Sequence, residues 1–194
     1  MGDKENLQRY LIRERDGLVG KLDGLSEYDV RRPLTPTGTS LLGLVKHVAF
    51  VQLGYLTLVF GRPVDWPGYA QDGRSDDDDL WVTADETREQ ILDYFRHSSA
   101  KADETIAALD LDAPGFVPWW GTQGERVTLQ RVLVHLIAEI ARHAGHADIL
   151  REGLDGAAGR WAGDPSLQER TPEKWAAYRA TVEAAARRAG DVTP

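Results

Sequence analysis

Apolar side chains recur at helical spacing over five stretches of the chain. In the first stretch, which predicts a helix over residues 3–23, they are Leu7, Leu11, Leu18 and Leu22. The other four stretches predict helices over 40–60, 84–109, 128–152 and 172–188. No stretch alternates apolar and polar residues between turn signals, as a half-buried strand would. The pattern therefore predicts an all-α protein.

Local signals indicate where three of these helices begin. Thr83 and Glu86 form a capping-box pattern for the third helix, and Thr128 can cap the fourth. Thr171 followed by Pro172 opens the last helix, with proline at its favoured first position. Long polar connections over 61–81 and 111–126 separate the second, third and fourth helices. Four main helices with two long connections predict a four-helix bundle that is not a simple up-down-up-down one.

The chain divides into a bundle over residues 1–153 and a tail over 154–194 that holds a loop and an extra C-terminal helix. Trp175, Tyr178 and Val182 form an apolar stripe on that helix. Such a stripe is buried either against the helix's own bundle or at a homodimer interface. Both arrangements stay open at this stage.

Composition narrows the class of protein. The chain has 194 residues, enough for one domain with a sizeable core. Its net charge is −8 and its Lys and Arg residues are scattered, and this charge pattern argues against nucleic-acid binding. No apolar run is expected to span a membrane, and the polar start MGDKENLQRY shows no secretory signal, so we expect a cytoplasmic protein. Cysteine is absent, so any thiol chemistry must use a thiol brought from outside.

An acidic run at Asp76–Asp79 is a candidate calcium loop. It lacks the spaced ligands, central glycine and terminal glutamate of an EF-hand. We therefore interpret it as a solvated loop before a helix.

The stretch HLIAEIARHAGH gathers His135, Glu139, His143 and His146. On a helical wheel their side chains share an arc of about 80° that runs along one flank of the apolar face. Burying these groups without partners would be costly, so they should be bonded, paired or metal-bound. Glu139 and His143 stand one turn apart, a spacing that suits joint ligation of one ion.

A third ligand should come from a facing helix, and His47 in the most apolar helix is the best candidate. A histidine in such a helix is otherwise a core residue bonded to a neighbour. Two histidines and one glutamate would hold a divalent ion with one open position, the pattern of a catalytic zinc site. His97 lies among polar residues and is expected on the surface.

The segments RRPLTPTGTSLLGLVKHVAF and VTLQRVLVHLIAEIARHAGHADILRE together resemble the DinB-like (YfiT-like) metal-dependent four-helix-bundle family. More closely, they resemble its actinobacterial mycothiol-transferase-like branch. The resemblance implies a divalent metal held by His47, Glu139 and His143, with zinc expected and nickel or iron as alternatives. Glu139 departs from the all-histidine form of the family and matches its mycothiol-dependent isomerases. His135 and His146 would then be catalytic or substrate-facing residues.

The resemblance also implies a low-molecular-weight thiol, mycothiol or bacillithiol, as cosubstrate. The leading hypothesis is a metal-dependent transferase in which the activated thiol attacks a small electrophile. Candidate substrate-binding residues are Tyr55, Trp119, Trp120 and Arg142, with a surface salt bridge as the alternative role for Arg142. Three other hypotheses stay open: a metal hydrolase with a metal-bound water, an iron oxygenase, and a non-catalytic metal- or ligand-binding stress protein.

Overall fold

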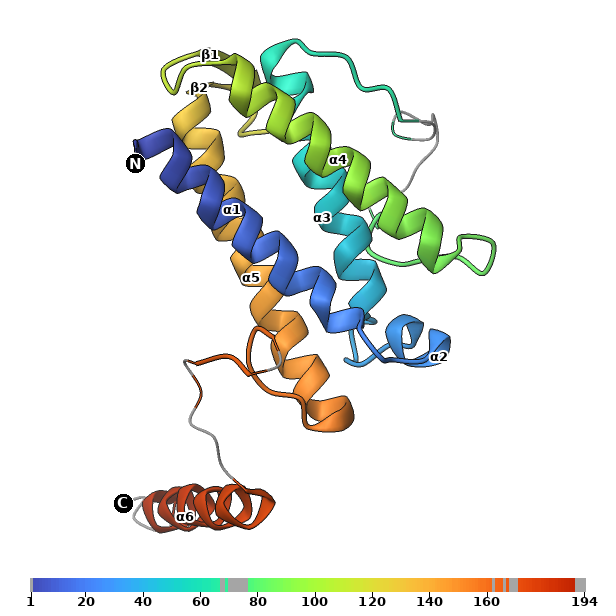
Figure 1. The fold of residues 1–194 in the computed structure, drawn as a ribbon, viewed down its shortest axis with the longest axis vertical. Coiled ribbons are helices and arrows are strands. Elements are labelled where there is room, and N and C mark those ends of the chain that lie inside the picture. Colours follow the sequence, from blue (N-terminus) through green and yellow to red (C-terminus); the bar gives the residue numbers. More distant parts are fainter. Residues whose placement is uncertain are drawn as a thin grey trace. The chain divides into compact units, whose positions relative to one another are not determined.

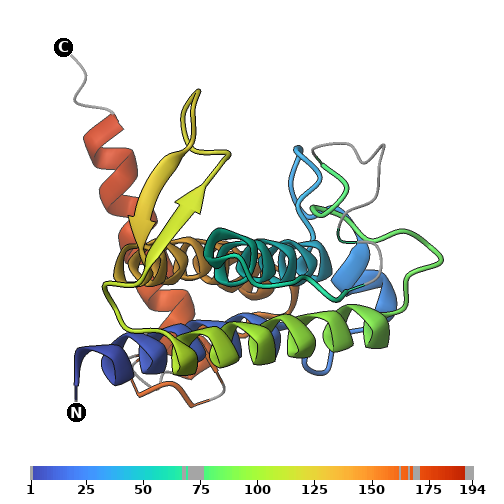
Figure 2. The ribbon, with the colours of Figure 1, turned by 90° about the horizontal axis from the view of Figure 1, so that it is seen from above.

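The computed structural model describes residues 2–66, 69, 77–161, 163–165, 167 and 171–190. Four long helices form a bundle in two layers, α1 with α4 and α3 with α5 (Figures 1 and 2). The helices α1 and α5 pack along each other, and α3 packs against both α4 and α5. The bounds are Asp3–Val19 for α1, Leu41–Leu56 for α3, Arg88–Ala108 for α4 and Leu129–Asp155 for α5. The predicted all-α bundle of the DinB-like type is confirmed.

The shorter elements lie at the ends of these helices. They are the 3-10 helices η1 (Gly20–Leu22) and η2 (Leu58–Phe60), the short helix α2 (Glu27–Arg31), and the strands β1 (Pro114–Val117) and β2 (Glu125–Thr128). The strands form one antiparallel hairpin, in which Gly115 pairs with Val127. The prediction that the chain holds no strand is therefore wrong. Each strand has four residues, too few to produce a clear alternation.

The third long helix begins later than predicted. Thr87 accepts a hydrogen bond from Gln90 N, and Gln90 Oε1 accepts one from Thr87 N at 2.7 Å, so these two residues form the capping box. The prediction that a capping box at Thr83 and Glu86 begins this helix is wrong. Glu86 Oε2 does accept from Thr83 N at 2.8 Å, but the pair closes a turn before the helix.

The helix α3 is the centre of the core. Its apolar side chains are buried nearly all round, and Ser40 caps its start by accepting from Gly43 N at 3.2 Å. By length and composition, the stretch Leu41–Phe60 could cross a membrane, with a mean hydropathy of 1.5, which corrects the expectation that no run would qualify. That stretch is 72% buried inside the structure, as expected for the core helix of a bundle.

One buried polar network crosses the bundle. Arg15 on α1 donates to Gln52 Oε1 at 2.7 Å and to Asp103 Oδ1 at 3.0 Å. The Gln52 amide in turn donates to Ser98 Oγ at 2.5 Å. Because a buried guanidinium needs most of its donors satisfied, this network specifies how α1, α3 and α4 face one another.

The chain divides into two compact units, Met1–Ala162 and Gly163–Pro194. The second unit contains α6 (Pro172–Gly190), which begins at the predicted Pro172. All residues of α6 are exposed, including Trp175, Tyr178 and Val182. The proposed packing of this helix, on its own bundle or in a dimer, stays a prediction.

Candidate metal centre

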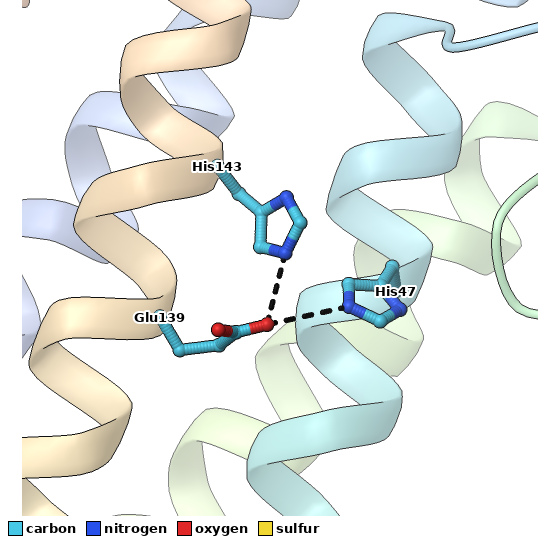
Figure 3. A group of neighbouring side chains, drawn as sticks. All are labelled: His47, Glu139 and His143. Atoms are coloured by element: carbon cyan, nitrogen blue, oxygen red, sulfur yellow. Dashed lines mark hydrogen bonds and ion pairs between the residues drawn. The ribbon is translucent and has the colours of Figure 1, made fainter. Parts of the chain in front are cut away.

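His47 on α3 and the pair Glu139 and His143 on α5 point toward one another between the two helices (Figure 3). His143 Nε2 lies 3.0 Å from Glu139 Oε1, and His47 Nε2 lies 3.8 Å from the same oxygen. One donor atom from each residue falls within 4.8 Å of the other two. The three residues predicted from the sequence as ligands therefore form one cluster.

The caps of α5 and the burial of α3 position these three side chains. Thr128 caps α5 by accepting from Arg131 N at 3.3 Å, and a left-handed glycine, Gly156, ends it with φ 79°. Along the helix between these caps, Glu139 and His143 are one turn apart and share a face. The burial of α3 in the core brings His47 opposite them.

The second nitrogen of the His47 ring is also engaged. His47 Nδ1 lies 2.7 Å from Asp79 Oδ2, in the segment before α4. A carboxylate oxygen can only accept, so Nδ1 donates to Asp79, and Nε2 is the nitrogen that faces Glu139. In contrast, His143 Nδ1 is buried and has no hydrogen-bond partner among the described residues.

Charge in the cluster is set by burial and by its close contacts. Burial raises the pKa of Glu139 most, but the hydrogen bond from His143 and the nearby histidines together outweigh it and lower that pKa. Burial lowers the pKa of His143, and the His47 ring lowers it further, while Glu139 opposes the change. At neutral pH Glu139 is therefore a carboxylate and His143 a neutral imidazole, and such groups attract a cation.

This donor set fits a divalent metal. The ligand atoms of a tetrahedral zinc ion lie about 3.4 Å apart, since each lies about 2.0–2.1 Å from the ion. The observed separations of 3.0 and 3.8 Å from Glu139 Oε1 fall on either side of that value. Asp79, which holds the outer nitrogen of His47, completes the carboxylate–histidine arrangement typical of metal sites.

An aromatic cluster lies one turn from Glu139. The Tyr55 hydroxyl accepts from Trp119 Nε1 at 3.0 Å and from Trp120 Nε1 at 2.6 Å. The His135 ring packs between Tyr55 and Trp120, with ring centroids at 4.8 and 4.9 Å. The lowered pKa of His135, mainly from burial, keeps it neutral at neutral pH. The structure thus brings four predicted site residues together beside the metal candidate.

The remaining predicted residues lie at its edge or away from it. His146 is exposed on α5, and its ring centroid is 5.6 Å from that of His143. Arg142 is exposed and forms no ion pair with the part of the chain that the structure describes. His97 contacts Asp65 at 2.8 Å and Trp66, and it is not part of the cluster.

Sequence reasoning missed Asp79. The solvated-loop interpretation holds for Asp77, which is exposed, but it is wrong for Asp79, which is 7% exposed and contacts His47. Asp76 lies outside the described residues. Four consecutive aspartates carry no signal that singles out the one folded inward, so only the tertiary structure could identify it.

Asp79 also lines a cavity of about 510 Å³ between α3, α4 and the segment before α4. Its volume is in the range of small-molecule sites. Its lining includes Asp79 and Lys46 but none of the three candidate ligands, and it is rich in aromatic and acidic side chains: Phe50, Trp66, Tyr69, Trp81, Tyr94, Asp78, Asp85 and Glu86.

Fold and site together define a helical-bundle protein whose central helix and α5 supply two histidines and one carboxylate to a single centre. A family model described as mycothiol-S-transferase matches residues 6–156, most of the chain. The chain therefore belongs to the mycothiol-S-transferase family, which is DinB-like.

A crystal structure of a conserved protein from Enterococcus faecalis has a TM-score of 0.57 to this chain at 19% identity. The match covers 81% of this chain and 99% of that one. At this identity the likeness shows the fold alone. No curated protein matches the chain.

Proposed function

We propose that the protein is a metal-dependent S-transferase that joins a low-molecular-weight thiol, mycothiol or a close analogue, to a small electrophile. The observation that carries the proposal is the convergence of His47, Glu139 and His143 on one centre in a chain of the mycothiol-S-transferase family. The absence of cysteine agrees with a thiol supplied from outside.

His47 and His143 would hold a divalent ion through Nε2, and Glu139 would hold it through Oε1. Such an ion, when bound, lowers the pKa of a coordinated thiol so that the sulfur is a thiolate near neutral pH. Glu139 offsets part of the ion's charge. Three protein ligands leave a position for the thiol, which a fourth protein ligand would close.

Neighbouring side chains suit the steps around sulfur transfer. His135 is neutral at neutral pH and next to Glu139, so it can accept the thiol proton. His146, at the exposed edge, is a second candidate for that role. The Tyr55 oxygen accepts from two indoles, so its own proton is available to an acceptor atom on the electrophile.

The electrophile would pack against Trp119 and Trp120, whose rings form a wall beside Tyr55. Arg142 would bind an anionic group of the substrate. These roles rest on position: Arg142 is exposed on the helix that carries Glu139 and His143 and has no competing ion pair with the described residues.

We infer that zinc is the ion, because two imidazoles and one carboxylate form a usual catalytic zinc set. We also infer a cytoplasmic location and a homodimer that uses the apolar stripe of α6. Light scattering coupled to size exclusion tests the dimer, since a particle of 21.5 kDa would be a monomer.

Cobalt(II) loading followed by thiol addition tests the function. The cobalt protein should show a new sulfur-to-metal absorption band with mycothiol, and the metal-loaded protein should consume thiol in the presence of an electrophile panel. His47→Ala should lose both signals, whereas the control His97→Ala, a histidine outside the centre, should keep both. An unchanged spectrum would indicate a closed site and a non-catalytic metal-binding protein. Ester or amide cleavage without thiol would indicate a hydrolase.

A further inference from the structure

The contact between Asp79 and His47 joins the segment Asp77–Glu86 to the candidate centre. The Asp79 and His47 side chains are only 10% and 18% exposed, and their polar atoms lie 2.7 Å apart. This contact joins residues 32 positions apart in the sequence. It determines the tautomer of His47 and the direction of its ring, and therefore which nitrogen faces Glu139.

The residue before His47 binds the same segment. Lys46 Nζ donates to the Trp81 carbonyl at 2.9 Å and forms an ion pair with Glu86 at 2.8 Å. Two consecutive residues of α3, Lys46 and His47, are thus held by side chains and backbone of Asp77–Glu86.

A glycine allows the segment to approach so closely. A Cβ at Gly43 would stand 2.2 Å from the Leu80 carbonyl oxygen, which is shorter than any real contact. Gly43 lies one turn before His47 on α3. Any larger residue there would displace Leu80 and its neighbour Asp79.

We propose that Asp79 is the positioning residue of the metal centre, and that docking of Asp77–Glu86 on α3 and metal binding at His47 are thermodynamically coupled. The inference rests on the proposed function, because it assumes that His47 is a ligand. Asp79 holds the Nδ1 proton, so Nε2 keeps its lone pair for the ion. A bound ion in turn makes the Nδ1 proton a better donor to Asp79, and linkage requires the two effects to be equal.

A purely structural role for Asp79 makes a different forecast. In that case, its replacement would lower the stability of the metal-free protein but leave the affinity of the folded protein for metal unchanged. Metal affinity and unfolding must therefore be measured on the same variants.

Zinc affinity, measured by competition with a chromophoric chelator, is the first test. Asp79→Asn removes the charge and should weaken zinc binding about 10–100-fold. Asp77→Asn makes the same change at an exposed neighbour and should bind zinc like the wild type. Asp79→Glu, which keeps the carboxylate, should recover part of the affinity.

Hydrogen exchange over Asp77–Glu86 is the second test. By linkage, zinc should shift the docking equilibrium of this segment by the same factor of about 10–100, and the amides of Leu80 and Thr83, which donate to Asp77 O and Glu86 Oε2, should slow. In Asp79→Asn the zinc-dependent slowing should disappear.

The possible results distinguish a failure of the proposed coupling from a failure of the proposed function. The coupling is overturned if Asp79→Asn binds zinc with wild-type affinity. It is also overturned if the wild type binds zinc but its hydrogen exchange over Asp77–Glu86 does not change. Either result leaves the proposed function in place. A wild-type protein that binds no zinc, cobalt or nickel overturns both.

Discussion

Trp120 donates a 2.6 Å hydrogen bond to the Tyr55 hydroxyl, and this bond connects the β1–β2 loop to the core helix α3. Because the same oxygen also accepts from Trp119, a single hydroxyl satisfies two indole donors. One oxygen atom of α3 therefore binds both indoles of this loop.

Tyr55→Phe should lower the free energy of unfolding by about 1–2 kcal/mol, because a half-buried indole N–H loses its acceptor. Tryptophan emission should also shift as the loop loosens. Urea denaturation followed by fluorescence measures both. Tyr10→Phe is the matched control, since Tyr10 is 44% exposed, and its change should stay below about 0.5 kcal/mol. Equal effects of the two changes would show that the Tyr55 hydroxyl does not hold the loop.

Gly43→Ala should destabilise the protein by about 1–3 kcal/mol, since its new methyl group meets the Leu80 carbonyl oxygen. Gly17→Ala should instead stabilise α1 by about 0.5–1 kcal/mol, because nothing lies within 4 Å of the added Cβ and alanine favours a helix. Thermal or urea unfolding of the two variants gives the comparison. A stable Gly43→Ala protein would mean that the segment does not lie this close to α3.

Gln52→Leu should cost about 2–3 kcal/mol, because it leaves Arg15 Nε buried without its acceptor. The Arg15 side chain is only 4% exposed, and this burial lowers the pKa of its guanidinium. Adding Arg15→Met should restore most of the loss, since an apolar pair of similar volume replaces the polar one. A double-mutant cycle by urea denaturation measures this, and strictly additive losses would argue against the network.

The metal-free protein should become less stable as the pH falls below 6.5, the ordinary histidine pKa. Burial lowers the folded-state pKa of His143 and His135, so the unfolded chain binds more protons than the folded one between that lowered pKa and 6.5, and stability rises with pH there. The lowered pKa of Glu139 acts in the same direction at more acidic pH, where its contribution is lost. Urea midpoints from about pH 5 to pH 8 test the sign.

Bound metal should steepen this dependence, because protons compete with it for the same ligand atoms. Comparing the metal-free and zinc-loaded proteins over the same pH range provides the control. A flat profile in both forms would contradict the assignment of buried, neutral imidazoles.

The periodicity of apolar residues was sufficient to predict the four long helices, because each buries a continuous face along many turns. It could not predict α2 or the hairpin, whose four or five residues are too few to establish a period. The start of α4 was misplaced because two capping patterns, Thr83 with Glu86 and Thr87 with Gln90, follow each other directly along the chain. Only the packing decides which of them begins the helix.

In the candidate site, too, local spacing could be predicted from the sequence but contacts between distant segments could not. The spacing of Glu139 and His143 placed both on one helix face. The place of His47 in the most apolar helix, and then the family resemblance, indicated it as the third member. The wheel could not show that His47 reaches that face, because this depends on how α3 crosses α5. The role of Asp79 could not be predicted from the sequence, since its contact with His47 depends on the path of a long connection.

Metal content of the purified protein, measured by mass spectrometry for the wild type and for His47→Ala, Glu139→Ala and His143→Ala, tests the central claim most directly. We predict about one divalent ion, zinc or a close substitute, per wild-type chain. Each variant should remain folded by circular dichroism and lose that ion, while His97→Ala retains it. A folded wild type that binds no ion even after divalent metal is added would contradict the account, and the cluster would then be a buried hydrogen-bond network.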